Sequence, residues 1–323
     1  MVIAADVGGT KTVFASVSGE SGGIILSSVT RYENEAFESF SDALNQFLSD
    51  VSFGPVKTLA IAAAGLISGD TCRMTNLNWA IEADELKRRF SIDSVLLLND
   101  LFSAAAGLDN MGDDSFDIIQ EGIFDGSGNQ VLISPGTGLG EAMIIRTEGK
   151  AVPVASEGGH ALFTPSDGTT VRLWDFLRKS KSRVIVEDVL SGPGIFNIYS
   201  YLVFDAGESI DEAIILCSDP GSIIVERALA DSDKLAVKAV QLFLDTLAIE
   251  ASNMALKALT TGGVIIGGGI VPRLQSMLDK KRFGELFCNH SAHESILEKI
   301  PIKIITDTEL PLYGAAEYAL AQG

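Results

Sequence analysis

The order of apolar and polar residues in the first third of the chain predicts strands that alternate with helices. Short apolar runs predict strands at residues 2–17 (two strands joined by a tight turn), 23–32, 56–67 and 95–98. Apolar residues at helical spacing, or helix-forming composition, predict helices at residues 35–51, 83–90 and 101–108. This alternation indicates an α/β domain with a mixed sheet.

The remainder of the chain repeats the pattern with more helix. Strands are expected from residue 130, from residue 141 with a loop after it as far as Phe163, at 262–266 and at 301–305. Helices are expected at residues 169–180, 185–190, 194–204 and 235–259, from Pro272, and at 312–321. The helix at 235–259 has apolar residues on most faces, so it should be largely buried.

The chain is long enough for two domains. Its 323 residues exceed what one hydrophobic core usually supports. The stretch Asp109–Asp117 is rich in Asp and Gly, which is typical of a passage between domains. We therefore expect a small α/β domain over residues 1–110, joined by a C-terminal helix at 307–323, and a large α/β domain over residues 111–306.

Charge and cysteine content narrow the class of protein. The net charge of −19 argues against binding to DNA or RNA, which requires a basic surface, but permits a small anionic ligand held by backbone donors and a metal ion. Cys72, Cys217 and Cys288 are far apart and match no zinc spacing, so they predict free thiols in a reducing compartment. Asp6 interrupts the apolar N-terminal run, which also lacks a basic flank, so this run is not expected to be a signal peptide. Gly and Pro break the other uncharged stretches, so no membrane-spanning helix is expected. We expect a cytoplasmic protein with no membrane contact.

Two strand–turn–strand segments carry glycine and threonine in the turn. Their turn residues are Gly8, Gly9, Thr10 and Lys11 in the first, and Gly136, Thr137 and Gly138 in the second. Glycine lets a ligand approach the backbone and permits a positive φ, successive backbone N–H groups suit phosphate oxygens, and the lysine adds a positive charge. An ordinary hairpin explains either segment alone. The repetition suggests a duplicated architecture that closes on one phosphorylated ligand.

Asn99 and Asp100 follow the predicted strand at 95–98 and precede a predicted helix. Ligands of α/β sheets bind beyond the carboxyl ends of the strands. Asp100 is then placed to accept a proton from a substrate hydroxyl, and Asn99 to hold a neighbouring hydroxyl. The alternative is that one of the two simply caps the helix.

The segment Ser156–His160 contains two glycines that favour a turn bringing Glu157 and His160 to one point. A carboxylate acceptor and an imidazole on one tight turn suit adjacent hydroxyls of a sugar. The alternative is an exposed loop with an incidental histidine. Glu187, taken alone, is a solvated charge on a helix.

Gly267, Gly268 and Gly269 end one predicted strand and open a helix, where a flat ring or a phosphate can approach the helix N-terminus. The alternative is a tight strand-to-helix turn. The chain contains neither G-x-x-x-x-G-K-[ST] nor G-x-G-x-x-G, so no P-loop or dinucleotide fingerprint supports a nucleotide site.

Taken together, these motifs resemble those of the bacterial glucokinases. The segments DVGGTKT, LLND, ISPGTGLGE, SEGGH, RVIVEDVLSGPG and GGVIIGGGIVPR occur in that family's order and spacing, over essentially the whole chain. The resemblance implies the α/β, two-domain, ribonuclease H-like fold of the actin-like ATPase and sugar-kinase superfamily, with a cleft between the domains. The Cys-rich zinc motif of a related branch is missing here.

The resemblance implies a role for each matching residue. Asp100 matches the catalytic base. In the mechanism that we expect for such an enzyme, Asp6 orders Mg²⁺ through water. The glucose ligands of the family correspond to Asn99, Glu157, His160, Glu187 and, in a further loop, Asn78. The nucleotide loops correspond to Gly8, Gly9 and Thr10, to Gly136, Thr137 and Gly138, and to Gly268 and Gly269. Mg²⁺ is expected to arrive with ATP, and a homodimer is expected.

The implied reaction is ATP-dependent phosphorylation of glucose at the 6-hydroxyl, which feeds glycolysis. Two other readings stay open, namely a kinase for another hexose or an N-acyl amino sugar, and a sugar-sensing regulator without turnover. Departures from the family pattern bear on the phosphate donor: Lys11–Thr12 replaces Asn-Ala, Ser134 replaces glycine, and Glu141 stands where an apolar residue is common.

Overall fold

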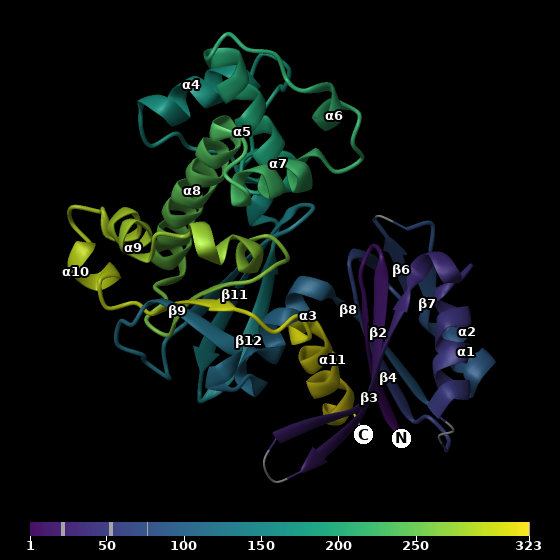
Figure 1. Cartoon of the computed structure of the whole chain (residues 1–323). Helices are drawn as coiled ribbons and strands as arrows, with labels where there is room; N and C mark the ends of the chain where they lie inside the picture. Colours follow the sequence, from purple (N-terminus) through teal and green to yellow (C-terminus); the bar gives the residue numbers. More distant parts are fainter. Residues whose placement is uncertain (21–22, 52–53, 76, 323) are drawn as a thin grey trace. The chain divides into compact units, whose positions relative to one another are not determined.

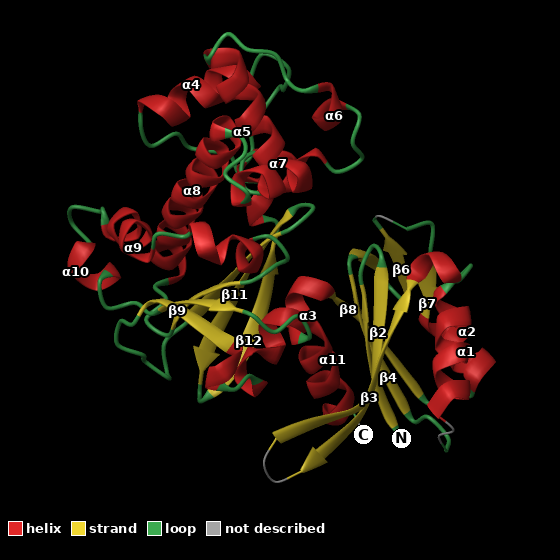
Figure 2. Cartoon of the chain, in the orientation of Figure 1, coloured by secondary structure: helices red, strands yellow, loops and turns green. Residues whose placement is uncertain are grey.

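The computed structural model describes residues 1–20, 23–51, 54–75 and 77–322 (Figure 1). They form two compact units. The first unit comprises residues 1–113, 151–154 and 307–323, and the second comprises residues 114–150 and 155–306. Each unit is built around its own mixed sheet, with helices on its faces (Figure 2).

The sheet of the first unit has the strand order β3-β2-β1-β4-β8. Its strands are β1 (Val2–Val7), β2 (Lys11–Glu20), β3 (Gly23–Glu33), β4 (Thr58–Ala63) and β8 (Ser94–Asn99). β1 pairs antiparallel with β2 and parallel with β4, and β4 pairs parallel with β8. The central strand β1 therefore ends directly in the turn to β2, beside the carboxyl ends of β4 and β8.

Helices cover both faces of this sheet. On one face, α1 (Phe40–Val51) and α2 (Ala83–Phe90) bury their apolar side chains against β1 and β4, and Phe14 stacks on Phe47 with ring centroids 5.0 Å apart. On the other face, α11 (Leu310–Ala321) buries Leu312 and three alanines against the same strands. α11 also lies beside α3 (Asp100–Gly107), so the C-terminal helix packs on elements from the first third of the chain (Figure 1).

The first unit also contains short elements that the sequence did not predict. A small antiparallel sheet consists of β5 (Gly65–Ser68), β6 (Thr71–Met74) and β7 (Ala80–Glu82). Single 3-10 turns lie at η1 (Asn34–Ala36) and η2 (Leu108–Asn110).

The second sheet has the order β12-β11-β10-β13-β14-β9 and belongs to the second unit, except for residues 151–154 of its edge strand, which are grouped with the first. Its strands are β9 (Phe116–Gln120), β10 (Gln130–Pro135), β11 (Leu139–Thr147), β12 (Lys150–Ser156), β13 (Gly263–Ile266) and β14 (Ile302–Ile305). β10 pairs antiparallel with β11 and parallel with β13, which in turn pairs parallel with β14. Its first five strands thus repeat the arrangement of the first unit, as the two glycine hairpins suggested.

The second unit is richer in helix. Its longer helices are α4 (Gly168–Leu177), α5 (Gly192–Asp205), α7 (Pro220–Leu229), α8 (Lys234–Ala258) and α9 (Lys280–Cys288). Its short elements are η3 (Asp113–Ser115), η4 (Gly158–His160), η5 (Val186–Asp188), α6 (Glu212–Ile215), η6 (Val271–Met277) and α10 (Glu294–Leu297). α8 packs on α5, α7 and α9 and is largely buried, as expected.

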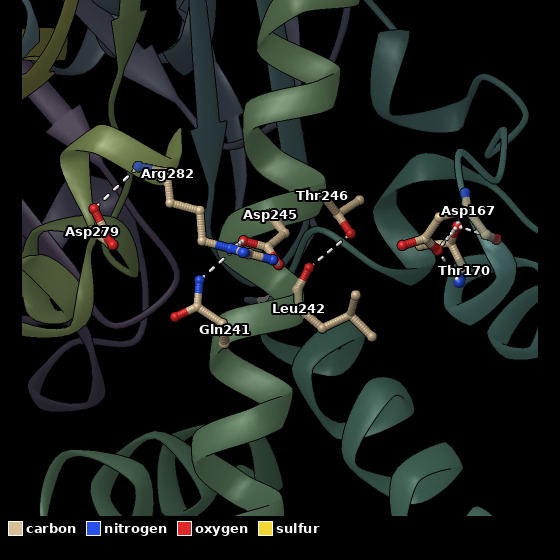
Figure 3. A network of polar contacts seen from close by, with 8 residues as sticks. All are labelled: Asp167, Thr170, Gln241, Leu242, Asp245, Thr246, Asp279 and Arg282. Atoms are coloured by element: carbon tan, nitrogen blue, oxygen red, sulfur yellow. Dashed lines mark hydrogen bonds and ion pairs between the residues drawn. The ribbon is translucent and has the colours of Figure 1, made fainter. Parts of the chain in front are cut away.

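The polar side of α8 is tied to its neighbour α9. Asp245 accepts two hydrogen bonds from Arg282 of α9, at 2.8 and 2.7 Å, and one from Gln241 at 3.0 Å (Figure 3). In the same view, Asp167 caps α4 by accepting a 2.7 Å hydrogen bond from the Thr170 N–H. The Arg282–Asp245 contacts hold α9 against α8.

Several boundaries differ from the sequence-based prediction for physical reasons. The expected loop up to Phe163 contains β12 and η4. Pro153 is compatible with a strand here because β12 lies at the edge of its sheet, where proline is tolerated. The expected helix at 185–190 is a single 3-10 turn, because the chain becomes extended at Ser191, which caps α5 instead. The helix expected from residue 35 begins at Phe40, and the helix expected from Pro272 is the 3-10 turn η6.

Two features of the described residues agree with the sequence. Cys72, Cys217 and Cys288 are free thiols. Across the described parts of the chain, none of the helices combines the length and apolar character needed to cross a membrane.

Candidate active site

The first glycine turn is held from one side by Asn34. This buried residue, 2% exposed, donates from Nδ2 to the Gly8 carbonyl at 3.0 Å, and its Oδ1 accepts from the Thr12 hydroxyl at 2.7 Å. Its backbone N–H also donates to the Thr10 carbonyl at 2.8 Å. Sequence reasoning missed Asn34, because an asparagine at the end of a strand carries no spacing signal. The Asn34 amide therefore holds the turn through the Gly8 carbonyl and the Thr12 hydroxyl.

The glycines of this turn can let a ligand approach the backbone closely, but they do not supply a positive φ. Among the described residues, neither Gly8 nor Gly9 has a positive φ, so that part of the sequence argument is wrong. The Gly8 N–H donates to the Lys11 carbonyl at 2.9 Å, and Thr10 is exposed. The Lys11 ammonium lies 3.6 Å from a carboxylate oxygen of Glu33, so its charge is shared with that residue.

Asp6 and Asp100 lie at the carboxyl ends of their strands and influence each other. Burial and, to a smaller extent, the Asp100 carboxylate raise the pKa of Asp6 to about 7, against the opposing effect of Arg31. Burial also raises the pKa of Asp100, while the backbone N–H groups of Leu101 and of Asp100 itself limit the rise. A carboxyl group whose pKa has moved toward neutrality is a more effective proton acceptor at pH 7 than an ordinary one.

Asn99 caps α3, as the alternative reading of that residue predicted. Its Oδ1 accepts a hydrogen bond from the Phe102 N–H at 3.1 Å. The cap uses the amide oxygen and leaves the NH₂ group for a second partner. Asp100 is the first residue of the helix, where a carboxylate is stabilised by the helix dipole. Asn78 is exposed in the connection between β6 and β7.

The second glycine turn is bound to Glu187. The Gly136 N–H donates to the Gly138 carbonyl at 2.8 Å, and the Leu139 N–H donates to Glu187 Oε2 at 2.8 Å. A Cβ at position 138 would lie 2.6 Å from that same oxygen, so a larger residue there would displace the Glu187 carboxylate. The Gly192 N–H, at the start of α5, donates to the Gly136 carbonyl at 2.8 Å. Glu187 is therefore a structural partner of the turn and not only a solvated charge.

The Ser156–His160 turn lies against β11. The His160 N–H donates to the Glu157 carbonyl at 3.0 Å, which closes the turn and leaves both side chains exposed. A Cβ at position 159 would overlap the Leu139 carbonyl, so glycine is required for this close approach. His160 Nε2 lies 3.9 Å from Glu187 Oε1. The structure thus brings His160, Glu187 and the 136–138 turn together.

The glycine run after β13 makes a tight connection. The Gly267 N–H donates to the Ile133 carbonyl at 2.8 Å. Gly268 has φ +78°, and a Cβ there would overlap the Pro135 carbonyl. Glycine at position 268 is therefore required by both strain and space. Because η6 is a 3-10 turn, it presents a weaker dipole than the α-helix that the sequence predicted.

The residues expected in the site divide between the two units. The first unit carries Asp6, Gly8, Gly9, Thr10, Lys11, Asn78, Asn99 and Asp100, and the second carries Gly136, Thr137, Gly138, Glu157, His160, Glu187, Gly268 and Gly269. Within the described residues, no group of three His, Cys, Asp or Glu side chains is arranged to hold a metal ion.

Comparisons with known proteins match this chain to glucokinases over nearly its whole length. The sequence model of the glucokinase family matches residues 3–322. A glucokinase of Synechocystis sp. is 31% identical, with 97% of this chain and 96% of that protein covered. A crystal structure of glucokinase from an Antarctic psychrotroph superposes with a TM-score of 0.88 at 29% identity, covering 99% of this chain and 98% of the other.

A more distant structure supports the fold alone. A ROK family glucokinase from Streptomyces griseus, solved in complex with glucose and AMPPNP, superposes with a TM-score of 0.65 at 23% identity, covering 100% of this chain and 99% of the other. The expected α/β fold of the actin-like ATPases and sugar kinases is confirmed. On the family match and on the full-length identity with curated relatives, this chain belongs to the glucokinase family.

Proposed function

We propose that this chain transfers the γ-phosphoryl group of ATP to the 6-hydroxyl of glucose, giving glucose 6-phosphate and ADP. One observation carries the proposal within the molecule. Glu187 uses one carboxylate oxygen to hold the 136–138 turn and places the other 3.9 Å from His160. Glu187 therefore lies beside both a turn suited to phosphate and a histidine suited to sugar hydroxyls, two groups that phosphoryl transfer to a sugar must bring together.

Asp100 is the proposed proton acceptor. Its position at the end of β8 and the start of α3 fixes its backbone, and its raised pKa favours uptake of the hydroxyl proton as the new bond forms. The transition state of phosphoryl transfer is loose, so the protein mainly positions groups and stabilises charge. The NH₂ group of Asn99 is suited to hold a neighbouring hydroxyl of the sugar.

The sugar contacts are proposed for Glu157, His160, Glu187 and Asn78. The side chains of Glu157 and His160 are exposed on a turn whose backbone is fixed by glycine contacts with β11. Groups that pair with each hydroxyl reject an epimer, because the epimer leaves a polar group without its partner.

The phosphate contacts are proposed for the backbone of the two glycine turns, Gly8–Lys11 and 136–138, with Gly268 and Gly269 facing the adenosine. Asp6 is a buried carboxyl with a raised pKa, and a bound cation would lower its cost of ionisation, so the residues present fit Mg²⁺. Bound with ATP, Mg²⁺ would neutralise charge on the phosphate oxygens, with Asp6 ordering it through water.

A sugar-by-donor activity panel tests the proposal. The chain is incubated with glucose, other hexoses and N-acyl amino sugars, each with ATP, ADP or polyphosphate, and phosphorylated sugar is measured. We expect glucose with ATP to give the highest kcat/KM. A higher value for another sugar would assign that sugar instead, and binding of glucose without turnover would indicate a regulatory protein.

Three further properties belong to the same proposal. The product is expected to enter glycolysis, the protein to be cytoplasmic, and the chain to form a homodimer. Light scattering of the purified protein measures the last of these directly, and a monomeric mass would refute it.

A further inference from the structure

Glu141 is a carboxyl group in a place that usually takes an apolar side chain. It lies on β11 opposite Ile133 of β10 and is 1% exposed. Its Oε1 atom is buried and makes no hydrogen bond to any described residue. Buried carboxyl groups normally have several donors or a cation beside them, so this one needs an explanation.

A cation and an amide of α8 serve another acid. On α8, Glu250 is 8% exposed, accepts a hydrogen bond from Asn253 Nδ2 at 3.0 Å, and lies 3.7 Å from the Lys257 ammonium. Glu141 faces this pair, and the charge of Glu250 acts on it unfavourably. Glu141 is thus next to a like charge that already occupies the local donors.

On its other side, Glu141 contacts the Ser156–His160 turn. A Cβ at position 158 would overlap Glu141 Oε2, so the carboxyl group fills the space left by the missing side chain of Gly158. The Ser156 hydroxyl donates to the Glu141 carbonyl at 2.9 Å and accepts from the Gly158 N–H at 3.2 Å. Both the backbone and the side chain of Glu141 therefore support the turn that carries Glu157 and His160.

We propose that Glu141 is a positioning residue of the sugar site: its carboxyl group, enclosed between α8 and the Ser156–His160 turn, fixes where Glu157 and His160 lie. The inference rests on the proposed role of that turn in binding the sugar. Glu141 does not touch the substrate itself, and acts only through the turn.

The protonation of Glu141 then controls the affinity for sugar. Burial and, to a smaller extent, the charge of Glu250 raise the pKa of Glu141 to about 7, and Lys257 opposes the rise. The other titratable side chains of the turn, Glu157 and His160, are exposed. Below pH 7 the carboxyl group is neutral, which suits a site that offers its Oε1 atom no hydrogen-bond donor. Above pH 7 it is a carboxylate, which is repelled by the charge of Glu250 and still has no donor for Oε1. The charged form favours a shift of the turn, so the KM for glucose rises with pH.

The test compares the parent chain with Glu141→Gln, which keeps the shape of the side chain and cannot ionise. KM and kcat for glucose are measured at saturating Mg-ATP from pH 6 to 8.5. We expect the parent KM to rise roughly threefold to tenfold across this range. This is the change produced when the pKa of Glu141 is about half to one unit higher in the sugar-bound protein than in the free protein. We expect Glu141→Gln to remove most of that rise, while the pH dependence of kcat, which reflects groups of the first unit, persists. Equal KM profiles for the two proteins would overturn the inference.

Two more variants keep the test decisive if Glu141→Gln does not fold. Glu250→Gln removes the like charge and should move the midpoint of the KM profile to lower pH, whereas Lys257→Met removes the cation and should move it to higher pH. Glu285→Gln, an exposed acid on α9, is the matched control and should leave the midpoint unchanged. Shifts in one direction, or no shifts, would refute the role of Glu141. A parent that does not phosphorylate glucose would refute the proposed function instead, and the same variants would then be compared by calorimetric titration with glucose.

Discussion

Asn34→Ala should loosen the first glycine turn and weaken ATP binding. The substitution removes two side-chain hydrogen bonds, to the Gly8 carbonyl at 3.0 Å and from the Thr12 hydroxyl at 2.7 Å. Each is worth about 1 kcal/mol net, and the Thr12 hydroxyl, which is 0% exposed, loses its partner at a further cost of about 1–3 kcal/mol. Because these terms overlap, we expect the free energy of unfolding to fall by about 2–4 kcal/mol.

The functional effect should fall on the nucleotide. A turn that is no longer held in one geometry must be ordered when the phosphates bind, so we expect the KM for ATP to rise about tenfold or more, the equivalent of about 1.4 kcal/mol. The KM for glucose should change less. Urea unfolding followed by circular dichroism measures stability, and steady-state kinetics measures both constants.

A matched double variant separates the hydrogen bonds from packing. Adding Thr12→Val to Asn34→Ala removes the unpaired hydroxyl, so the double variant should recover about 1 kcal/mol relative to the sum of the single changes. The reasoning fails if Asn34→Ala costs less than about 1 kcal/mol and leaves the KM for ATP at the parent value.

Four other outcomes are expected. Asp100→Ala should lower kcat by about 10²–10⁴-fold, the usual contribution of a general base, and undiminished phosphorylation of glucose would remove it from that role. Glu157→Ala should raise the KM for glucose steeply in the same assay, and a neutral result would exclude it from the sugar site. Gly268→Ala forces a side chain onto φ +78° and into the Pro135 carbonyl, so urea unfolding should show a loss of more than about 1 kcal/mol, and a neutral result would contradict the geometry. The pKa of Glu141 is raised from 4.5 to about 7 in the folded chain, so the protonated form stabilises the fold. This contribution, up to about 3 kcal/mol, is fully present below pH 4.5 and is lost as the pH rises through 7. The free energy of unfolding of Glu141→Gln should therefore decline less over that pH range than that of the parent.

The fold was predictable where the pattern of apolar residues is long or strict. The buried strand β4 and the 25-residue helix α8 follow directly from their apolar residues. The prediction failed where tertiary contacts decide the local structure. β12 has exposed Val152 and Val154 and an internal proline, and it is a strand because it extends the edge of an existing sheet. No local pattern contains that information.

The candidate site was predictable as a set of residue types and not as a set of contacts. Glycine-rich turns and the polar residues that follow strands mark where ligands can approach, and these were found from the sequence. What holds them was not found. Asn34 is 26 residues from Gly8, and Glu187 is 48 residues from Leu139, so only the folded sheet brings either pair together. Glu141 was visible in the sequence as an unusual acid, but its contact with Gly158 was not.

The two units hold their glycine turns in place with different kinds of side chain. Each has a glycine turn between the first two antiparallel strands of a repeated sheet, and each turn is held by a polar side chain from a distant segment. In the first unit the holder is the neutral amide of Asn34, which is buried and engaged on both sides. In the second it is the carboxylate of Glu187, which is partly exposed and uses one oxygen for the turn. A buried amide can only hold the turn, whereas a partly exposed carboxylate can hold it and still accept a hydrogen bond from a ligand. This difference between Asn34 and Glu187 is consistent with the proposed roles, in which the first glycine turn binds only the nucleotide and the second lies beside both the nucleotide and the sugar.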